Sequence, residues 1–137
     1  MLKKGNIIIS LALLQAKLLK QIDNQLSLHG ISFSEFLVMY HLKTAPNKTM
    51  RRIDLAEKVG LTASGVTRLL NPMEKIKLVQ KEINPRDARV SLVKLSEAGN
   101  QIYNQSAVSF EQSAETILKP LHKKQILNLS ELTNAIM

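Results

Sequence analysis

The chain has 137 residues, of which 45% are hydrophobic and 22% are charged. This length and composition predict a single soluble domain over residues 1–137 with a core of its own. No apolar stretch reaches the roughly 18 residues that a membrane helix needs, and no signal-peptide cleavage site follows the apolar stretch near the start. The chain contains no cysteine, which excludes disulfides and thiol redox switches. We therefore expect a cytoplasmic protein without a membrane partner.

The net charge of +8 is concentrated in one internal segment. Twelve basic and five acidic residues lie between Lys43 and Lys94, so this segment carries +7 and the two flanks together carry +1. A basic segment of this kind is typical of proteins that bind a polyanion. A merely solubilising surface would give the same charge, so the residue pattern within the segment has to decide between the two interpretations.

The first two predicted helices have clear start and stop signals. Apolar residues recur every three or four positions over residues 7–28, which predicts an amphipathic helix. Gly30 ends it, because glycine readily adopts the left-handed conformation that follows a last helical turn. Ser32 and Glu35 have the spacing of a capping box and predict a second helix that runs to Leu42. The turn formers at residues 45–47 break the chain.

Two short helices follow. The third is predicted over residues 50–59 and ends at Gly60, and Thr62 caps a fourth that begins at Ala63. Their inward-facing residues are expected to be Ile53, Leu55, Ala56 and Val59 on the third helix, and Val66, Leu69 and Leu70 on the fourth.

The rest of the chain predicts a hairpin and two more helices. Residues 78–83 and 90–95 are β-prone, and the turn formers between them indicate a β-hairpin with a basic tip. Ser96 begins a long fifth helix whose apolar positions alternate in steps of three and four, and Pro120 bends or ends this helix. A last helix carries Ile126, Leu129, Leu132 and Ile136.

The third and fourth helices have the spacing of a helix-turn-helix. Ala56 is small where the two helices cross, Gly60 tolerates a positive φ in the turn, and Val66 anchors the second helix in the core. Any helical bundle can contain a hairpin with this spacing. The basic β-hairpin that follows favours DNA binding, because the two motifs together make a winged helix.

The outer face of the fourth helix carries the residue types that read DNA. Its N-terminal end would enter the major groove, where an Arg bonds guanine and a Thr or Ala touches the thymine methyl. Arginines of the hairpin would reach the minor groove or phosphates, with Asp87 orienting one of them by a salt bridge. A solvated helix face with one ordinary arginine is the alternative. The expected DNA contacts are Thr62, Ala63, Ser64, Thr67, Arg68, Arg86 and Arg89.

The chain resembles the MarR family of winged-helix transcriptional regulators over essentially its whole length. The residues that carry the resemblance are Asp54-Leu55-Ala56, Gly60-Leu61-Thr62, Val66-Thr67-Arg68-Leu69, Leu78-Val79, Asp87-Ala88-Arg89-Val90, Leu92 and Leu95-Ser96-Glu97-Ala98-Gly99. The resemblance implies a homodimer with interleaved terminal helices that binds palindromic operators. Members of the family are often released from DNA by small anionic aromatic ligands.

Two residues depart from the family pattern. Pro72 stands where the family often has an arginine, and a proline inside the recognition helix is expected to kink it or end it early. Lys77 stands where the family usually has glycine, which predicts a strained turn into the wing.

The apolar stripes of the terminal helices are more than a small winged helix needs for its own core. We therefore favour a dimer interface over an intramolecular core for them. The expected fold class is mainly α with a small β-hairpin wing, a winged helix-turn-helix lobe over residues 44–95 flanked by dimerisation helices at residues 1–30 and 100–137. The expected interface residues are Leu11, Leu14, Leu18, Phe110, Ile117, Leu129, Leu132 and Ile136.

These patterns predict a homodimeric, sequence-specific DNA-binding regulator. A repressor that acts on a palindromic operator is the favoured interpretation. The alternative is a winged helix used for protein–protein contact without specific DNA binding. No catalytic residues, cofactor or metal site is expected, since His29, His41 and His122 are scattered and suit surfaces or helix ends. An effector, if the family's ligand chemistry applies, is expected between the lobe and the terminal helices near Tyr40 and His41.

Overall fold

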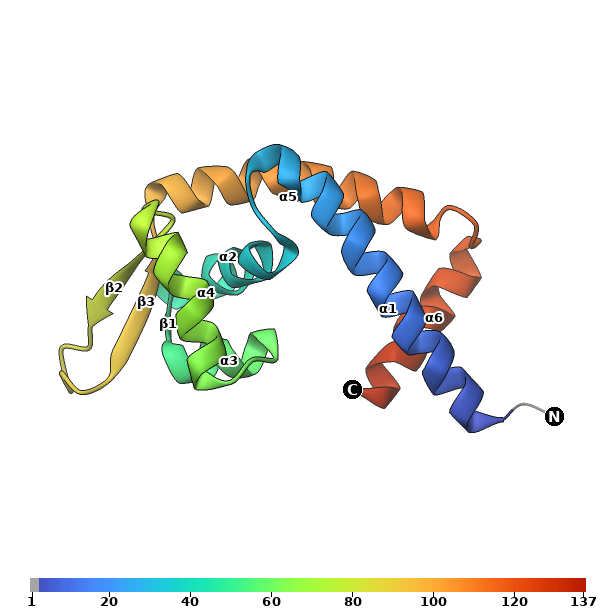
Figure 1. Cartoon of the computed structure of the whole chain (residues 1–137), viewed down its shortest axis with the longest axis horizontal. Coiled ribbons are helices and arrows are strands. Elements are labelled where there is room, and N and C mark those ends of the chain that lie inside the picture. Colours follow the sequence, from blue (N-terminus) through green and yellow to red (C-terminus); the bar gives the residue numbers. More distant parts are fainter. Residues whose placement is uncertain (1–2) are drawn as a thin grey trace.

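The computed structural model describes residues 3–137, and residues 1–2 of the predicted N-terminal segment lie outside them. Figure 1 shows an arch in which the long helix α5 crosses the top, with a compact lobe at one end and the two chain termini near the other. The helices are α1 (Lys4–Leu26), α2 (Phe33–Thr44), α3 (Arg52–Val59), α4 (Ala63–Lys75), α5 (Glu97–Leu118) and α6 (Lys123–Ile136). None of the described helices is long and apolar enough to cross a membrane.

The predicted start and stop signals of the helices are confirmed. Gly30 has φ 74° after the short 3-10 turn Ser27–His29 that ends α1. Ser32 and Glu35 form both hydrogen bonds of the capping box at the start of α2. Ser96 caps α5 by accepting a hydrogen bond from the backbone N–H of Gly99 at 2.9 Å. These local bonds satisfy the free amide groups that every helix start exposes.

The sheet has three strands rather than the two of the predicted hairpin. Strands β2 (Val79–Ile83) and β3 (Ser91–Leu95) form the antiparallel wing, and β1 (Thr49–Arg51) pairs with the other edge of β3, in the order β1-β3-β2. Met50 lies opposite Val93. The prediction that α3 begins at residue 50 was therefore wrong, because pairing with β3 keeps these residues extended and three residues are too few to show an alternating pattern.

The core lies in the lobe between α2, α3, α4 and the sheet. Its buried hydrophobic residues come from residues 26 to 95, and Phe36, Val38, Leu55 and Val66 are among them. Ile53 was predicted to face inward, but its side chain is 64% exposed. The first turn of α3 follows directly from β1, and this places Ile53 on the outer side while Leu55 and Ala56 face the core.

Pro72 does not end the recognition helix. Helix α4 continues through it to Lys75, so the expectation of an early end was wrong. A proline removes one backbone hydrogen bond from a helix, and the next turn is held by Met73, which is fully buried in the core. The strained turn predicted at Lys77 is confirmed, since this residue has φ 64°, the left-handed region that glycine tolerates and a lysine does not favour.

Candidate nucleic-acid interface

The helix-turn-helix is built as its spacing predicts. Gly60 has φ 71°, and the backbone N–H of Leu61 donates to the carbonyl of Ala56 at 2.9 Å, which closes the turn between α3 and α4. The Oγ1 atom of Thr62 accepts a hydrogen bond from the N–H of Gly65 at 3.0 Å and caps α4. Since Gly60 supplies the turn and Thr62 the cap, the N-terminal end of α4 is fixed at the surface.

The two faces of α4 differ sharply. Val66, Leu70 and Met73 are buried against the lobe core, whereas Ala63, Ser64, Thr67 and Arg68 are exposed. The hydroxyl of Thr67 donates to the carbonyl of Ala63 at 3.1 Å, so its hydrogen is used within the helix. The exposed N-terminal part of α4 therefore offers a partner small side chains that allow a close approach, together with the guanidinium of Arg68.

The wing tip is ordered by its acidic and amide side chains. The carboxylate of Asp87 accepts hydrogen bonds from Nε and Nη2 of Arg89, at 3.1 and 3.3 Å, and from the Arg89 backbone N–H. The side-chain bonds to Arg89 lower the pKa of Asp87 most, and the backbone bond lowers it further. The predicted salt bridge is thus present. Asn84 accepts a bond from the backbone N–H of Arg86, and both arginines are exposed.

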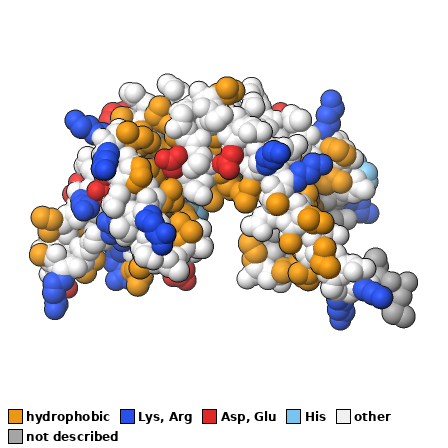
Figure 2. Space-filling model, viewed as in Figure 1, with side chains coloured by type: hydrophobic (Ala, Val, Ile, Leu, Met, Phe, Trp, Pro, Cys, Tyr) orange, Lys and Arg blue, Asp and Glu red, His pale blue; other side chains and the backbone are white. Residues whose placement is uncertain are grey.

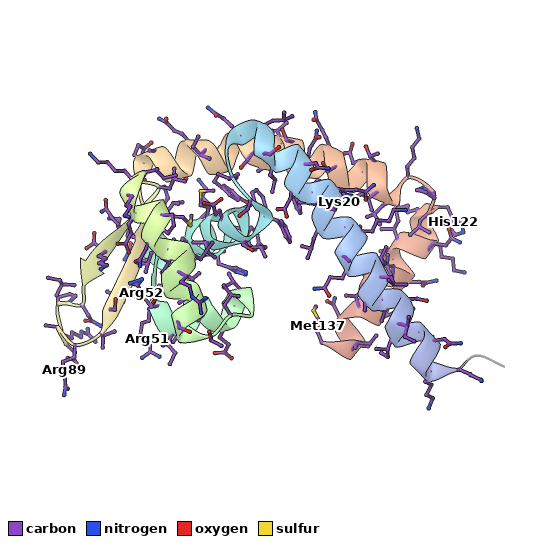
Figure 3. All side chains as sticks on the ribbon, in the orientation of Figure 1. Lys20, Arg51, Arg52, Arg89, His122 and Met137 are labelled. Carbon is purple, nitrogen blue, oxygen red and sulfur yellow. The ribbon has the colours of Figure 1, made fainter. Side chains whose placement is uncertain are left out.

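A groove of about 360 Å³ joins the recognition helix to the wing. Its walls include Ala63 and Thr67 from α4, Arg89 at the end of the wing loop, and Arg51 and Arg52 from the start of α3. Figure 3 shows Arg51 and Arg52 beside the N-terminal end of α4, and Arg89 at the tip of the wing. The groove therefore brings together predicted DNA contacts from the helix, Ala63 and Thr67, and one from the wing, Arg89. Ser64, Arg68 and Arg86 lie outside it.

Arg51, Arg52 and Ile53 were missed as interface residues by the sequence reasoning. Residues 50–53 were assigned to the inner side and body of a helix, so their side chains were not expected on this surface. The available signal was the pair of adjacent arginines directly before the apolar positions of α3. Arg51 is paired with Asp54, Nε to Oδ2 at 3.1 Å, and Ile53 adds an exposed apolar side chain to the groove.

The three histidines lie at or near helix ends, and no group of three His, Cys, Asp or Glu side chains in the described part of the chain is placed to hold a metal ion. Nε2 of His29 lies 2.7 Å from Oγ of Ser109, and His122 caps α6 through its Nδ1 atom. His41 lies at a hollow of about 640 Å³ on the lobe, with Tyr40, Arg51 and Lys58 also on its walls. Burial, and then the charge of Lys58, lower the pKa of His41.

These features define a winged helix-turn-helix protein. Residues 31–91, which include the helix-turn-helix, match the model of the MarR family. The chain is 22% identical over 106 residues to an uncharacterized HTH-type transcriptional regulator, YhbI, of Bacillus subtilis, a match that covers 77% of this chain and 68% of YhbI.

The whole described architecture recurs in solved structures. AbsC, a MarR family transcriptional regulator from Streptomyces coelicolor, is 20% identical with a TM-score of 0.87, over 99% of this chain and 94% of its own. A mutant MarR from E. coli, solved in complex with operator DNA, is 23% identical with a TM-score of 0.85, over 99% of both chains. The predicted fold class, mainly α with a β-hairpin wing between terminal helices, is confirmed.

Proposed function

We propose that this protein is a transcriptional regulator that binds DNA through α4 and the wing. The observation that carries the proposal is the groove in which the exposed end of a capped helix meets three arginines, Arg51, Arg52 and Arg89. Backbone phosphates attract exposed arginines such as Arg51 and Arg89, and the small surface of α4 allows a close approach to base edges. The E. coli relative that was solved on operator DNA supports the same partner for this chain.

Within this interface we assign different tasks to the helix and the wing. Arg68 reads a base in the major groove, with Ala63, Ser64 and Thr67 close to the groove floor. Arg86 and Arg89 hold the adjacent minor groove or its phosphates, and Asp87 keeps the Arg89 guanidinium oriented. Thr62 contributes through its cap on α4 and as an exposed hydroxyl at the same end.

The proposed regulator acts as a homodimer through residues 1–30 and 100–137, with the lobe over residues 44–95 as its DNA-binding part. Two symmetric lobes set their recognition helices about one DNA turn, roughly 34 Å, apart, and such a dimer reads a palindromic operator. The apolar side chains of α1 and α6 support this assembly. Ile7, Leu11, Leu14, Leu129, Leu132 and Ile136 are all exposed on the single chain.

We assign this dimer the role of a repressor, which blocks transcription when it is bound to its operator. A ligand would act by changing the spacing of the two lobes. We assign such a ligand, a small anionic aromatic compound, to the hollow of the lobe beside Tyr40 and His41, which has Arg51 and Lys58 but also Asp54 on its walls. Such a ligand releases DNA only if it binds the DNA-free form more tightly. A regulator of this kind needs no catalytic residue or cofactor, and it works where the genome is, in the cytoplasm.

Selection of bound sequences from a random DNA pool tests the proposal. The expected product is a palindrome whose two halves lie one helical turn apart, bound with an affinity that falls steeply as salt rises because phosphate contacts release counterions. Recovery of no preferred sequence, together with weak salt dependence, would refute DNA recognition. A winged helix used for protein–protein contact would then explain the fold better.

A further inference from the structure

Glu74 connects the recognition helix to two other elements of the lobe. Its Oε1 atom lies 3.9 Å from Nη1 of Arg52, the first residue of α3, and its Oε2 atom lies 3.9 Å from Nζ of Lys81 in β2. The side chains of Arg52 and Glu74 are only 17% and 21% exposed. One carboxylate therefore joins the start of α3, the last turn of α4 and a strand of the wing.

The Arg52–Glu74 pair is poorly suited to stabilising the fold. Nη2 of Arg52 and Oε1 of Glu74 are buried, and neither has a hydrogen-bond partner among residues 3–137. Both charges have been taken out of water without full compensation, and apolar side chains of similar size often stabilise such a position as well or better. A contribution to stability thus does not explain why these two charged side chains lie here.

The position of the pair points to the interface instead. Pro72 has no N–H, so the carbonyl of Arg68 lacks its usual partner four residues on, and the backbone ladder of α4 is interrupted between Arg68 and Glu74. Arg52 also lines the groove between α4 and the wing, together with Thr67 and Arg89. The ion pairs of Glu74 therefore hold the turn of α4 that follows the missing bond between Arg68 and Pro72.

We propose that Arg52 and Glu74 are positioning residues for DNA recognition. Their ion pair, with Lys81 as the second partner of Glu74, fixes α4 against α3 and the wing so that Arg68 and Arg89 reach the same DNA segment together. This inference rests on the proposed function. It assigns the pair an effect on operator recognition that its charges alone would not produce.

Glu74→Gln gives the sharpest test, because electrostatics and positioning predict opposite results. Removal of a carboxylate raises the net charge, so an interface governed by charge alone would bind every DNA more tightly. Positioning predicts that affinity for the selected operator falls about tenfold, while affinity for random DNA does not fall. Fluorescence anisotropy with operator and random duplexes at several salt concentrations measures both.

Arg52→Gln and the double variant separate positioning from direct contact. If Arg52 only orients α4, Arg52→Gln weakens operator binding about as much as Glu74→Gln, and Arg52→Gln/Glu74→Gln, whose net charge equals that of the parent, weakens it no further. If Arg52 instead binds a phosphate, Arg52→Gln lowers the salt slope by about one unit per protomer and its effect adds to that of Glu74→Gln. The second result would overturn the proposal.

Asp54→Asn is the matched control. The Arg51–Asp54 pair lies at the same end of α3, with Nε and Oδ2 3.1 Å apart, but both side chains are about half exposed. Its loss is expected to change operator affinity by less than about twofold, since exposed pairs contribute little. An effect as large as that of Glu74→Gln would show that any charge change near the groove acts this way, against the proposal.

Circular-dichroism melts of every variant separate positioning from unfolding, and binding is measured well below the lowest melting temperature. Glu74→Gln leaves the charge of Arg52 buried without its partner. If the fold does not tolerate this, the double variant, which buries neither charge, provides the test through the ratio of its affinity for the operator to its affinity for random DNA. A parent protein that prefers no DNA sequence defeats the proposed function. A parent that selects its operator, with variants that do so equally well, defeats only the role of Arg52 and Glu74.

Discussion

The lobe and the terminal helices bury their apolar residues in different ways. Among the described residues, all fifteen buried hydrophobic side chains lie between Leu26 and Leu95, so α2 and the lobe share a core within the single chain. Helix α6 has no buried residue, and α1 buries only Leu26. Figure 2 shows hydrophobic side chains gathered on the surface at the end where α1 and α6 lie. The apolar residues of α1 and α6 thus lie largely on the surface of the single chain.

The two regions are nevertheless joined by contacts between α2 and α5. Phe36 of α2 packs against Phe110 and Tyr103 of α5, with ring centroids 4.7 and 5.3 Å apart. Nζ of Lys43 donates to Oδ1 of Asn100 at 2.6 Å. A change in how the terminal helices associate would therefore move the lobe, and this gives a physical route from a dimer interface or ligand to the spacing of two recognition helices.

The largest effect is expected from breaking the interface of the terminal helices. Leu14→Asp places a charge on the exposed apolar face of α1 and is expected to give a monomer in sedimentation velocity. Operator affinity then falls more than about a hundredfold, because the second lobe no longer binds as part of the same molecule. Ile76→Asp, at an exposed isoleucine of the lobe, is the control and is expected to leave the dimer intact. A Leu14→Asp variant that remains dimeric would contradict the assignment of this face.

Gly99→Ala breaks the junction between the two regions. A Cβ at Gly99 would overlap the backbone carbonyl oxygen of Leu78 and lie 2.7 Å from Cδ1 of Leu95, so α5 would have to move away from the sheet. We expect a loss of about 3 kcal/mol in the free energy of unfolding, measured by chemical denaturation. Gly5→Ala in α1 has nothing within 4 Å and should be neutral or slightly stabilising. Equal stability of the two variants would contradict the close packing at Gly99.

Within the lobe, the two faces of α4 can be separated by paired substitutions. Val66→Ala removes a buried side chain and should cost about 2 kcal/mol of stability while changing base preference little. Arg68→Ala should leave stability unchanged, cost about 1–3 kcal/mol of operator binding, and relax the preference at one position of each half-site. Thermal melts and anisotropy on single-base operator variants measure both. Binding of every operator variant by Arg68→Ala with the same affinity as by the parent would show that the reading face is misassigned.

The sequence predicted the turn and the cap of the helix-turn-helix correctly because their signals are local. Gly60 and Thr62 each act through a backbone conformation or a hydrogen bond within three residues, and the structure confirms both. The position of β1 depends on pairing with β3, more than forty residues away, and residues 49–51 carry no pattern of their own. The groove shares this dependence, because Arg51, Arg52 and Arg89 meet only after the sheet has formed.

Pro72 shows how tertiary packing overrides a local rule. Proline is the strongest helix breaker, and its position alone argued for an early end to α4. The burial of Leu70 and Met73 on either side of it holds the helix to the core, and this depends on contacts that the local pattern does not contain.

Arg89→Ala tests the wing with a smaller effect than Arg68→Ala. Arg89 is 91% exposed on its side chain and already bonded to Asp87, so its loss should leave the fold unchanged. Affinity should fall about equally for all sequences, with the salt slope lowered by about one unit per protomer. Altered base preference at the centre of a half-site would place Arg89 in the major groove instead. A preference for narrow minor grooves at the flank remains compatible with the wing.

The smallest effect concerns His41 in the lobe. Burial first, and the nearby Lys58 second, lower its pKa in the folded protein below the ordinary 6.5. The unfolded chain therefore binds a proton more readily than the folded one, so His41 reduces stability as the pH falls below 6.5 toward the lower folded value. His41→Gln should lose less melting temperature than the parent between about pH 7.5 and 5.5. Lys58→Gln should reproduce only a minor part of this change, because burial is the main cause. If His41→Gln loses as much melting temperature as the parent, the His41 side chain titrates as it does in water. The hollow beside Tyr40 would then be open to solvent.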